Sequence, residues 1–437
     1  MTGARGVARV RVTLPRGRHG GHPFPAADED MFTLAVRAAG AVEEPAGGEG
    51  PTPYGRLHLV GEFRAEGDWQ FAAALAIPEL PIVHYPATAA GVAQALVAMR
   101  SGSGSPELLL TVDTPREGVE ASEVAAAAAV VADRSEELLE SLASVEAPTA
   151  ASGGGRPSTE SVERLLEAHS ESSAVAFRLY GDVPPGISAV IGRRLEGPTV
   201  IVDRAGSGPD DGHPTGVFRV AARLAERLRT GESGWAAVVD ARRVAAFRVR
   251  PGAGWSVEPP SAEPSEAIEA APSALLSAVS EGAYVPRPTY VGNISARWRL
   301  VAARCANCGT STFPPRGSCR SCGATERLEP TPLPRRDARV VAVTTVHPGA
   351  HPTEFDPLVT ARGAYTVALV EPVPGVRITT QLAGPPGVRV AIGDLVDLEL
   401  RRLYPMEGEW RYGLKAVVRP PHRERTPTAA TPTPSAK

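Results

Sequence analysis

Four cysteines within one short window are the residues whose type and spacing define a chemistry most clearly. They stand in the segment RCANCGTSTFPPRGSCRSCGA as two CxxC pairs separated by ten residues, Cys305 with Cys308 and Cys319 with Cys322. Each pair can form a tight turn that directs two thiolates to one point, and two such turns complete a tetrahedral sulfur site. A closed four-sulfur site suits Zn²⁺ and leaves no coordination position for a substrate. The spacing therefore predicts a structural zinc ion.

Two other chemistries are open to these cysteines, a redox pair or a pair of disulfides. Redox motifs normally occur as a single CxxC near a βαβ unit, whereas this segment carries two. Gly309 and Gly323 directly follow the two pairs, where the backbone must turn sharply. Both observations favour zinc.

The overall composition narrows the class of protein. A chain of 437 residues is too long for one hydrophobic core and indicates two or three domains. Its formal net charge of -3 gives no overall attraction to nucleic acid. The longest nearly apolar run, residues 124–132, is far shorter than the roughly 20 residues of a membrane span. The N-terminus has no continuous apolar signal-peptide core and no cysteine lies outside the ribbon window, so we expect a soluble cytoplasmic protein.

Short alternating runs follow the cysteines and are typical of β-strands. Gly, Pro and Asp clusters separate these runs. Five such strands fit a small Greek-key barrel such as an OB-fold, a fold that does not by itself reveal its ligand. The runs are residues 339–347, 365–371, 376–382, 395–400 and 410–418.

The order of motifs in this region resembles one known family. CxxC, FPPR, a second CxxC, a strand ending in VHPG, YTVALVE and IGDLVDLEL follow one another over about residues 290–420. This order resembles the zinc-ribbon/OB-fold proteins of acyl-CoA metabolism that are catalogued as domain of unknown function thirty-five. The resemblance implies an accessory subunit or fused domain of thiolase-like enzymes, including 3-hydroxy-3-methylglutaryl-CoA synthase-like proteins. It also implies acyl-CoA as a ligand or channelled substrate.

The N-terminal part alternates apolar strand-like runs with Ala-rich helical runs, which indicates α/β architecture. The pieces PAADEDMFTLAVRAA, LHLVGEF, VHYPATAAGVAQALVAMRSG and LLLTVDTP, followed by AAAAAVVAD, occur in an order that resembles the thiolase superfamily. Its 3-hydroxy-3-methylglutaryl-CoA synthase-like members are nearest. A later piece, GHPTGVFRVAARLAERLR, resembles the thiolase motif in which a histidine opens a helix. The resemblance implies two α/β halves, of which the second is shortened here.

The resemblance also implies a catalytic cysteine at the N-terminus of a central helix, where the helix dipole lowers the thiol pKa. Aligning ATAAGVAQAL with that helix places Tyr85 at the nucleophile position, and no cysteine exists outside the ribbon. The glutamate of the synthase-like motif fails to align as well, because Phe63 occupies its position and Glu62 is one residue early. No cysteine-based acyl-enzyme can form on this chain.

Two residues keep an active interpretation open. Tyr85 is a candidate proton donor or acceptor if burial beside a cation lowers its pKa, and His213 stands where a thiolase carries a catalytic histidine. The alternatives are that Tyr85 fills a vacated pocket and that His213 is an ordinary loop residue. His84 is a weaker candidate, since a lone histidine beside an apolar strand is more often a hydrogen-bonded core residue.

Taken together, the sequence predicts a shortened, thiolase-like layered α/β domain followed by a zinc ribbon and an all-β OB-fold barrel. The boundaries are marked by linker composition rich in Pro, Ser, Ala and Gly. They are 1–255 for the thiolase-like domain with a flexible insertion at 147–157, 256–290 for a linker, 291–330 for the ribbon, 331–420 for the barrel and 421–437 for a disordered tail.

The leading functional prediction is a non-catalytic accessory subunit of a thiolase-type complex that processes acyl-CoA. Its partner would be a cysteine-containing thiolase or condensing-enzyme homologue, and the chain would be part of an oligomer. The first alternative is a cysteine-free, thiolase-like aldolase that uses Tyr85 and His213 to cleave a carbon–carbon bond. A remote alternative is a nucleic-acid module, which would need a basic groove with stacking aromatic residues.

Overall fold

The computed structural model of the chain describes a series of residue ranges. For the described residues between 140 and 257, it describes the path of the backbone only. Four predictions lie outside the described residues: the insertion at 147–157, His213, a helix at 216–229 and the tail at 421–437. The described residues are 5–14, 17–19, 22–24, 28–43, 54–77, 79–87, 89–100, 105–112, 126–133, 140–146, 174–181, 199–204, 233–239, 243–249, 255–257, 286–347, 363–384, 388–406 and 409–418.

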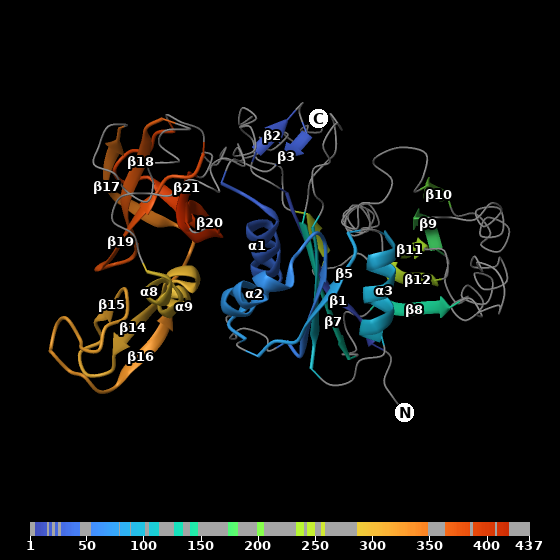
Figure 1. Ribbon diagram of the computed structural model, residues 1–437, viewed down its shortest axis with the longest axis horizontal. Coiled ribbons are helices and arrows are strands. Elements are labelled where there is room, and N and C mark those ends of the chain that lie inside the picture. Colours follow the sequence, from blue (N-terminus) through green and yellow to red (C-terminus); the bar gives the residue numbers. More distant parts are fainter. Residues whose placement is uncertain are drawn as a thin grey trace, which may run out of the picture.

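Two halves of identical strand order form the sheet of the N-terminal part (Figure 1). With the strands of each half numbered one to five along the chain, both halves run 3-2-4-5-1, and the fifth strand is antiparallel to both neighbours. Strands β1 and β8 join the halves through an antiparallel pairing. This repeat of strand order agrees with the two halves that the thiolase resemblance implied.

The strand bounds of the first half are β1 Arg5–Thr13, β4 Arg56–Val60, β5 Ile82–Tyr85, β6 Glu107–Val112 and β7 Ala126–Asp133. Those of the second half are β8 Glu140–Glu146, β9 Ala174–Gly181, β10 Thr199–Arg204, β11 Ser233–Val239 and β12 Arg243–Val249, with β13 Trp255–Val257 paired to β1. Strands β2 (Gly17–His19) and β3 (His22–Phe24) form a separate pair.

Helices cover both faces of the first half-sheet. Helix α1 (Met31–Glu43) and helix α2 (Asp68–Leu75), preceded by the short turn η1 (Ala65–Gly67), lie on one face (Figure 1). Helix α3 (Ala89–Arg100) lies on the other and contacts strands of both halves, among them β4, β5, β11 and β12. The helix that was aligned with the central thiolase helix thus lies against strands of both halves of the sheet.

Alanine makes strand β7, although it is a good helix former in isolation. Ala126, Ala127, Ala128 and Ala129 are at most 1% exposed, and β7 lies between β6 and β1. Both faces of this strand are covered, and small side chains let the helices approach closely. Tertiary packing therefore overrides local propensity here.

Helix α1 begins with a reciprocal cap. Asp30 Oδ1 accepts a hydrogen bond from the Thr33 backbone N–H at 2.9 Å, and Thr33 Oγ1 accepts one from the Asp30 N–H at 2.8 Å. In the acidic run before this helix, Asp30 makes the cap, whereas Asp28 and Glu29 bind basic residues of the C-terminal part.

The C-terminal part consists of two short helices, a ribbon and a barrel. Its five barrel strands confirm the five predicted runs and are ordered β19-β18-β17-β20-β21. A parallel bridge between Leu382 and Ala416 brings the end of β19 against β21, so the barrel is nearly closed. The bounds are α8 Arg287–Gly292, α9 Ile294–Arg299, β14 Val301–Cys305, β15 Ser311–Thr312, β16 Leu328–Pro332, β17 Ala338–Val346, β18 Tyr365–Val373, β19 Val376–Gln381, β20 Leu395–Met406 and β21 Glu409–Val418.

An aromatic cluster joins the two parts of the chain. Trp298 on α9 is 1% exposed, and its Nε1–H donates to the Tyr412 carbonyl of β21 at 2.9 Å. Its ring contacts Phe32 of α1 and Trp69 of α2 at centroid distances of 5.7 Å and 6.3 Å. Because these residues come from both parts, they form one continuous core.

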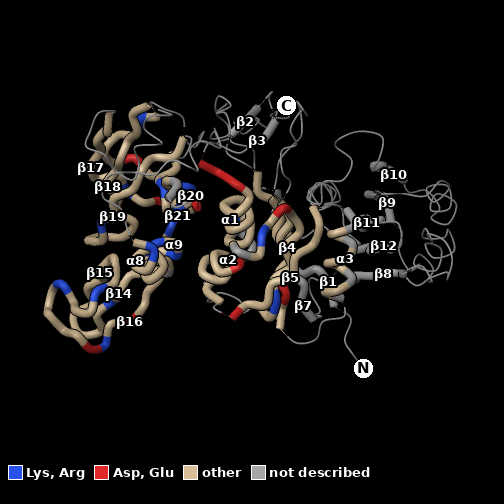
Figure 2. Tube along the Cα trace, viewed as in Figure 1, with Lys and Arg blue, Asp and Glu red and all other residues tan. Residues whose placement is uncertain are grey.

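Acidic positions just before α1 lie on the side of strands β20 and β21 (Figure 2), and buried ion pairs complete the junction here. Arg401 of β20 lies 2.6 Å from Glu29, and Lys415 of β21 lies 3.1 Å from Asp28, with all four residues at most 6% exposed. Arg37 of α1 also reaches Glu29 at 2.6 Å. Buried charges need such partners because they have lost their water. Among the described residues, no helix is long and apolar enough to cross a membrane.

Candidate metal centre and the Tyr85 cluster

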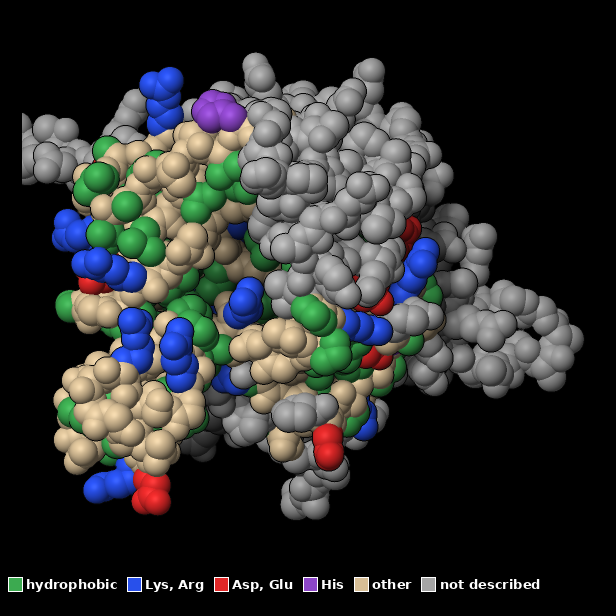
Figure 3. Space-filling view, turned by 60° about the vertical axis from the view of Figure 1, so that its left-hand side comes forward, with side chains coloured by type: hydrophobic (Ala, Val, Ile, Leu, Met, Phe, Trp, Pro, Cys, Tyr) green, Lys and Arg blue, Asp and Glu red, His purple; other side chains and the backbone are tan. Residues whose placement is uncertain are grey.

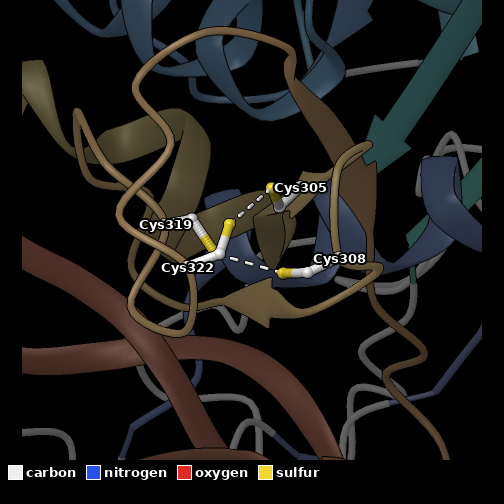
Figure 4. A group of neighbouring side chains, drawn as sticks. All are labelled: Cys305, Cys308, Cys319 and Cys322. Carbon is white, nitrogen blue, oxygen red and sulfur yellow. Dashed lines mark hydrogen bonds between the residues drawn. The ribbon is translucent and has the colours of Figure 1, made fainter.

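The four cysteines converge on one point, as their spacing predicted (Figure 4). Their Sγ atoms all lie within 4.8 Å of one another, with 3.7 Å between Cys305 and Cys322 and 3.5 Å between Cys308 and Cys319. Cys305 and Cys319 are buried, whereas Cys308 and Cys322 are exposed. Four sulfur ligands in this arrangement fit the tetrahedral preference of Zn²⁺.

Two matching turns position these sulfur atoms. The Gly309 N–H donates to the Cys305 carbonyl at 2.8 Å, and the Gly323 N–H donates to the Cys319 carbonyl at 3.0 Å. Both glycines have positive φ, 74° and 73°, which a residue with a side chain rarely adopts. The sharp turns predicted from the sequence are therefore present in both halves of the ribbon.

Without metal, neighbouring groups shift the pKa values of the two exposed thiols in opposite directions. Hydrogen bonding with Thr310 lowers the pKa of Cys308 to about 6. The Ala324 backbone lowers the pKa of Cys322, but the thiol of Cys308 and the loss of solvent outweigh it and raise this pKa to about 11. The Ser321 N–H donates to Cys319 Sγ at 3.4 Å. Zinc in this site would be held by protein ligands in all four positions, so its role is structural.

Tyr85 lies at the end of β5, and helix α3 begins four residues later at Ala89. Its hydroxyl oxygen is 2.9 Å from Nδ1 of His58, and Nε2 of His58 is 2.7 Å from Oε2 of Glu107. These three residues come from the adjacent parallel strands β5, β4 and β6. We refer to them as the Tyr85 cluster.

Burial raises the pKa of Tyr85; the positive charge of Arg56 opposes this rise, and Glu107 adds to it. The condition set for the active interpretation, a lowered pKa, is therefore not met. The reason is that the loss of solvent outweighs the nearby cation. Tyr85 keeps its proton at neutral pH.

Other candidate positions have packing roles. Nε2 of His84 lies 2.8 Å from Oδ1 of Asp68, the first residue of α2, so His84 is hydrogen-bonded as expected. Phe63 packs its ring against Phe71 at 5.3 Å, and Glu62 is exposed. The position of the missing glutamate therefore holds a packing side chain.

His58 and Glu107 were missed by the sequence interpretation. His58 is fully buried and Glu107 is 5% exposed. Leu57 and Leu59 face the core with α1 and α2, so the alternation of the strand turns His58 to the side of α3. A histidine within the apolar run LHLV was the available signal.

Two comparisons with known proteins match the C-terminal part of the chain. Residues 296–329 match the family model described as ChsH2, rubredoxin-like zinc ribbon domain. A Methanocaldococcus jannaschii protein named DUF35 domain-containing scaffold protein is 32% identical over 111 residues, which are 25% of this chain and 74% of that protein.

Two solved structures illustrate the structural comparisons. A 3-oxoacyl-(acyl-carrier protein) synthase from Burkholderia xenovorans is 14% identical and covers 59% of this chain and 97% of its own, with a TM-score of 0.42. A structure described as Ltp2-ChsH2(DUF35) aldolase is 28% identical and covers 27% of this chain and 84% of its own, with a TM-score of 0.21. With its ribbon and barrel matched over most of the archaeal relative, the chain belongs to the DUF35 domain-containing proteins, and here that module is fused to a thiolase-like domain of two α/β halves.

Proposed function

We propose that this protein is a non-catalytic scaffold subunit of a thiolase-type complex that processes acyl-CoA. The observation that carries the proposal is the DUF35 module, because the archaeal relative that shares it is named a scaffold protein. The thiolase-like domain supplies the surface that a thiolase or condensing-enzyme homologue recognises. The ribbon and the barrel, which we interpret as an OB-fold, guide acyl-CoA to that partner. The assembly is an oligomer in the cytoplasm.

The chemistry of the thiolase-like domain supports a role other than acyl transfer. Acyl transfer of the thiolase type needs a thiolate nucleophile, and all four cysteines of the sequence lie in the ribbon. Tyr85, at the aligned nucleophile position, is a phenol that keeps its proton at neutral pH. A partner must therefore contribute the reactive cysteine.

The junction supports the scaffold role in physical terms. The DUF35 module is fixed to the thiolase-like domain by a shared aromatic core and by buried ion pairs to Asp28 and Glu29. The ribbon strands β14 to β16 project away from this junction (Figure 1). A rigid junction with a projecting ribbon lets one chain hold a partner in a defined orientation.

Positive charge on the ribbon side supports acyl-CoA as the ligand. Arginine side chains gather over the barrel and ribbon, with fewer acidic groups between them (Figure 3). Guanidinium groups bind phosphates well, and a CoA carries several phosphates. The exposed basic residues between 286 and 347 are Arg287, Arg297, Arg304, Arg316, Arg320, Arg327, Arg336 and Arg339, against Glu326, Glu329 and Asp337.

A turnover assay on the pure full-length chain tests the absence of catalysis. Acetoacetyl-CoA and free CoA serve as the probes, and loss of the acetoacetyl absorbance reports thiolysis. We expect no thiolysis above the rate of a heat-denatured sample. Thiolysis that is saturable in acetoacetyl-CoA and proportional to the concentration of the chain would refute the proposal.

A further inference from the structure

The Tyr85 cluster has the geometry of a proton relay. Its members stand on three adjacent strands, and each end of the His58 imidazole has a partner, at 2.9 Å and 2.7 Å. His58 is 0% and Glu107 5% exposed, whereas Tyr85 is of intermediate exposure. Tyr85 is thus the most exposed residue of this cluster.

The two contacts of His58 fit one tautomer of a neutral imidazole, and we assign that tautomer to the relay. In it, Nε2–H donates to the Glu107 carboxylate and Nδ1 accepts the hydroxyl hydrogen of Tyr85. Because burial raises the pKa of Tyr85, this hydrogen is present at neutral pH. The lone pairs of the phenol oxygen remain able to accept a proton from a ligand.

We propose that Tyr85 is an acid/base centre, with His58 as its proton acceptor and Glu107 as the residue that orients His58. The order of the three hydrogen-bonded groups resembles the nucleophile, histidine and carboxylate of hydrolases. The ligand class is a molecule with a hydroxyl or enol group. The O–H bond of the ligand breaks and its proton is transferred to Tyr85 Oη, while the phenolic proton of Tyr85 moves to His58 Nδ1. The ligand oxygen then carries the negative charge, and Glu107 balances the imidazolium.

The surroundings of the cluster suit this proton transfer. The positive charge of Arg56 acts on Tyr85 and stabilises negative charge that develops at its oxygen. Helix α3, which covers this side of the sheet, has the sequence AAGVAQALVAMR and carries charge only at its last residue. Among these groups, Glu107 is therefore the anion that faces His58.

A close backbone contact holds Tyr85 in place. A Cβ on Gly91 would lie 2.0 Å from the Pro86 carbonyl oxygen, so helix α3 packs directly on the residue that follows Tyr85. Preorganised geometry of this kind is what a proton-transfer site needs. The inference goes beyond the scaffold role, because it adds proton transfer to a chain that is non-catalytic in acyl transfer. It does not depend on that role, since failure to bind a partner would leave the relay intact.

A tyrosine-directed reagent tests the relay without knowledge of the ligand. Phenylmethylsulfonyl fluoride is the probe: its sulfur bonds to the phenol oxygen, fluoride leaves, and the phenolic proton passes to His58. The full-length chain is treated at pH 7 and the labelled peptides are quantified by mass spectrometry. We expect Tyr85 to react at least about tenfold faster than N-acetyltyrosinamide, and Tyr290 and Tyr412, which have raised pKa values, to serve as slow internal controls.

Two variants distinguish labelling of Tyr85 that depends on proton transfer to His58 from labelling that depends only on the exposure of Tyr85. His58→Gln keeps a polar side chain but cannot take the proton, and Glu107→Gln keeps the shape but loses the charge. We expect both to slow Tyr85 labelling at least about tenfold, with circular dichroism matching wild type, and the His58→Gln rate to rise tenfold per pH unit with hydroxide. If wild-type Tyr85 reacts no faster than N-acetyltyrosinamide, the proposal is overturned. Equal labelling of wild type and folded Glu107→Gln would overturn it as well.

Discussion

Nζ of Lys415 lies 3.1 Å from Oδ2 of Asp28, although 387 residues separate them in the sequence. Both side chains are buried, and Lys415 is one of only two lysines in a chain whose other basic residues are arginines. With Arg401 beside Glu29, this pair fixes the DUF35 barrel to the segment just before helix α1 of the thiolase-like domain. Contacts at the junction therefore contribute to the free energy of unfolding of the chain.

Replacement of Lys415 by Met should destabilise the junction. The substitution leaves the Asp28 carboxylate buried with Arg401 at 3.6 Å as its remaining cation in the described network. Removing one partner of a buried ion pair costs about 3 kcal/mol. Urea unfolding followed by tryptophan fluorescence measures the loss, since Trp298 lies in the same junction.

The double variant Asp28→Asn with Lys415→Met is the matched control. It removes both charges, so we expect it to recover at least about half of the loss. A double variant no more stable than Lys415→Met alone would show that the pair is not the relevant interaction.

Alkaline pH should weaken the junction through Tyr290. Burial raises the pKa of Tyr290 to about 12 from an ordinary value of 10.0. Between these values the folded state keeps the proton while the unfolded state releases it, so the free energy of unfolding falls as pH rises, by about 1.4 kcal/mol per pH unit for one such group. The measurement is urea unfolding at pH 9, 10 and 11. Tyr290→Phe should show a flatter dependence, and an unchanged slope would contradict this origin.

Removal of zinc should unfold the ribbon while leaving the N-terminal sheet in place. Cys305→Ser deletes a buried ligand, and structural zinc contributes directly to the folding of small ribbons. We expect zinc content to fall from one ion per chain to less than about a tenth, and hydrogen exchange to rise in β14 to β16 but not in β4 or β6. Ser321→Ala is the control, because Ser321 contacts Cys319 through its backbone. If Cys305→Ser keeps its zinc, the site is assigned wrongly.

Two glycine substitutions should have opposite effects. A Cβ on Gly91 meets backbone at 2.0 Å, so Gly91→Ala must displace α3 or the turn after Tyr85, at a cost of about 2 kcal/mol. A Cβ on Gly40 of α1 has no atom within 4 Å, so Gly40→Ala should stabilise the helix by about 0.5–1 kcal/mol. Thermal unfolding of the two variants checks the sign of each change in stability. Equal effects would contradict the close packing of α3.

Local patterns explain what the sequence could predict. The spacing of Cys305 to Cys322 predicted the ribbon, and period-two alternation predicted all five barrel strands. The predicted run at 395–400 is too short, because pairing with β21 extends β20 to Met406 through the segment RRLYPM, which begins with two arginines. A strand end that depends on its partner is not visible in local alternation.

Contacts between distant residues explain what the sequence could not predict. The Tyr85 cluster depends on the register of three strands, which brings together residues separated by 27 and 49 positions. The pairing of the acidic run before α1 with Arg401 and Lys415 joins distant residues and had no local signal. The direction of the Tyr85 pKa shift stayed open because the extent of burial depends on the whole fold.

The central claim is that the chain holds a thiolase-type partner, and co-purification tests it most directly. The tagged full-length chain is purified from its native cell next to the Cys305→Ser variant, and bound proteins are identified and quantified by mass spectrometry. We predict a thiolase-superfamily protein with an active-site cysteine, in a fixed ratio to the wild-type chain and depleted from the variant. Recovery of the wild-type chain with no thiolase-superfamily protein would contradict the claim.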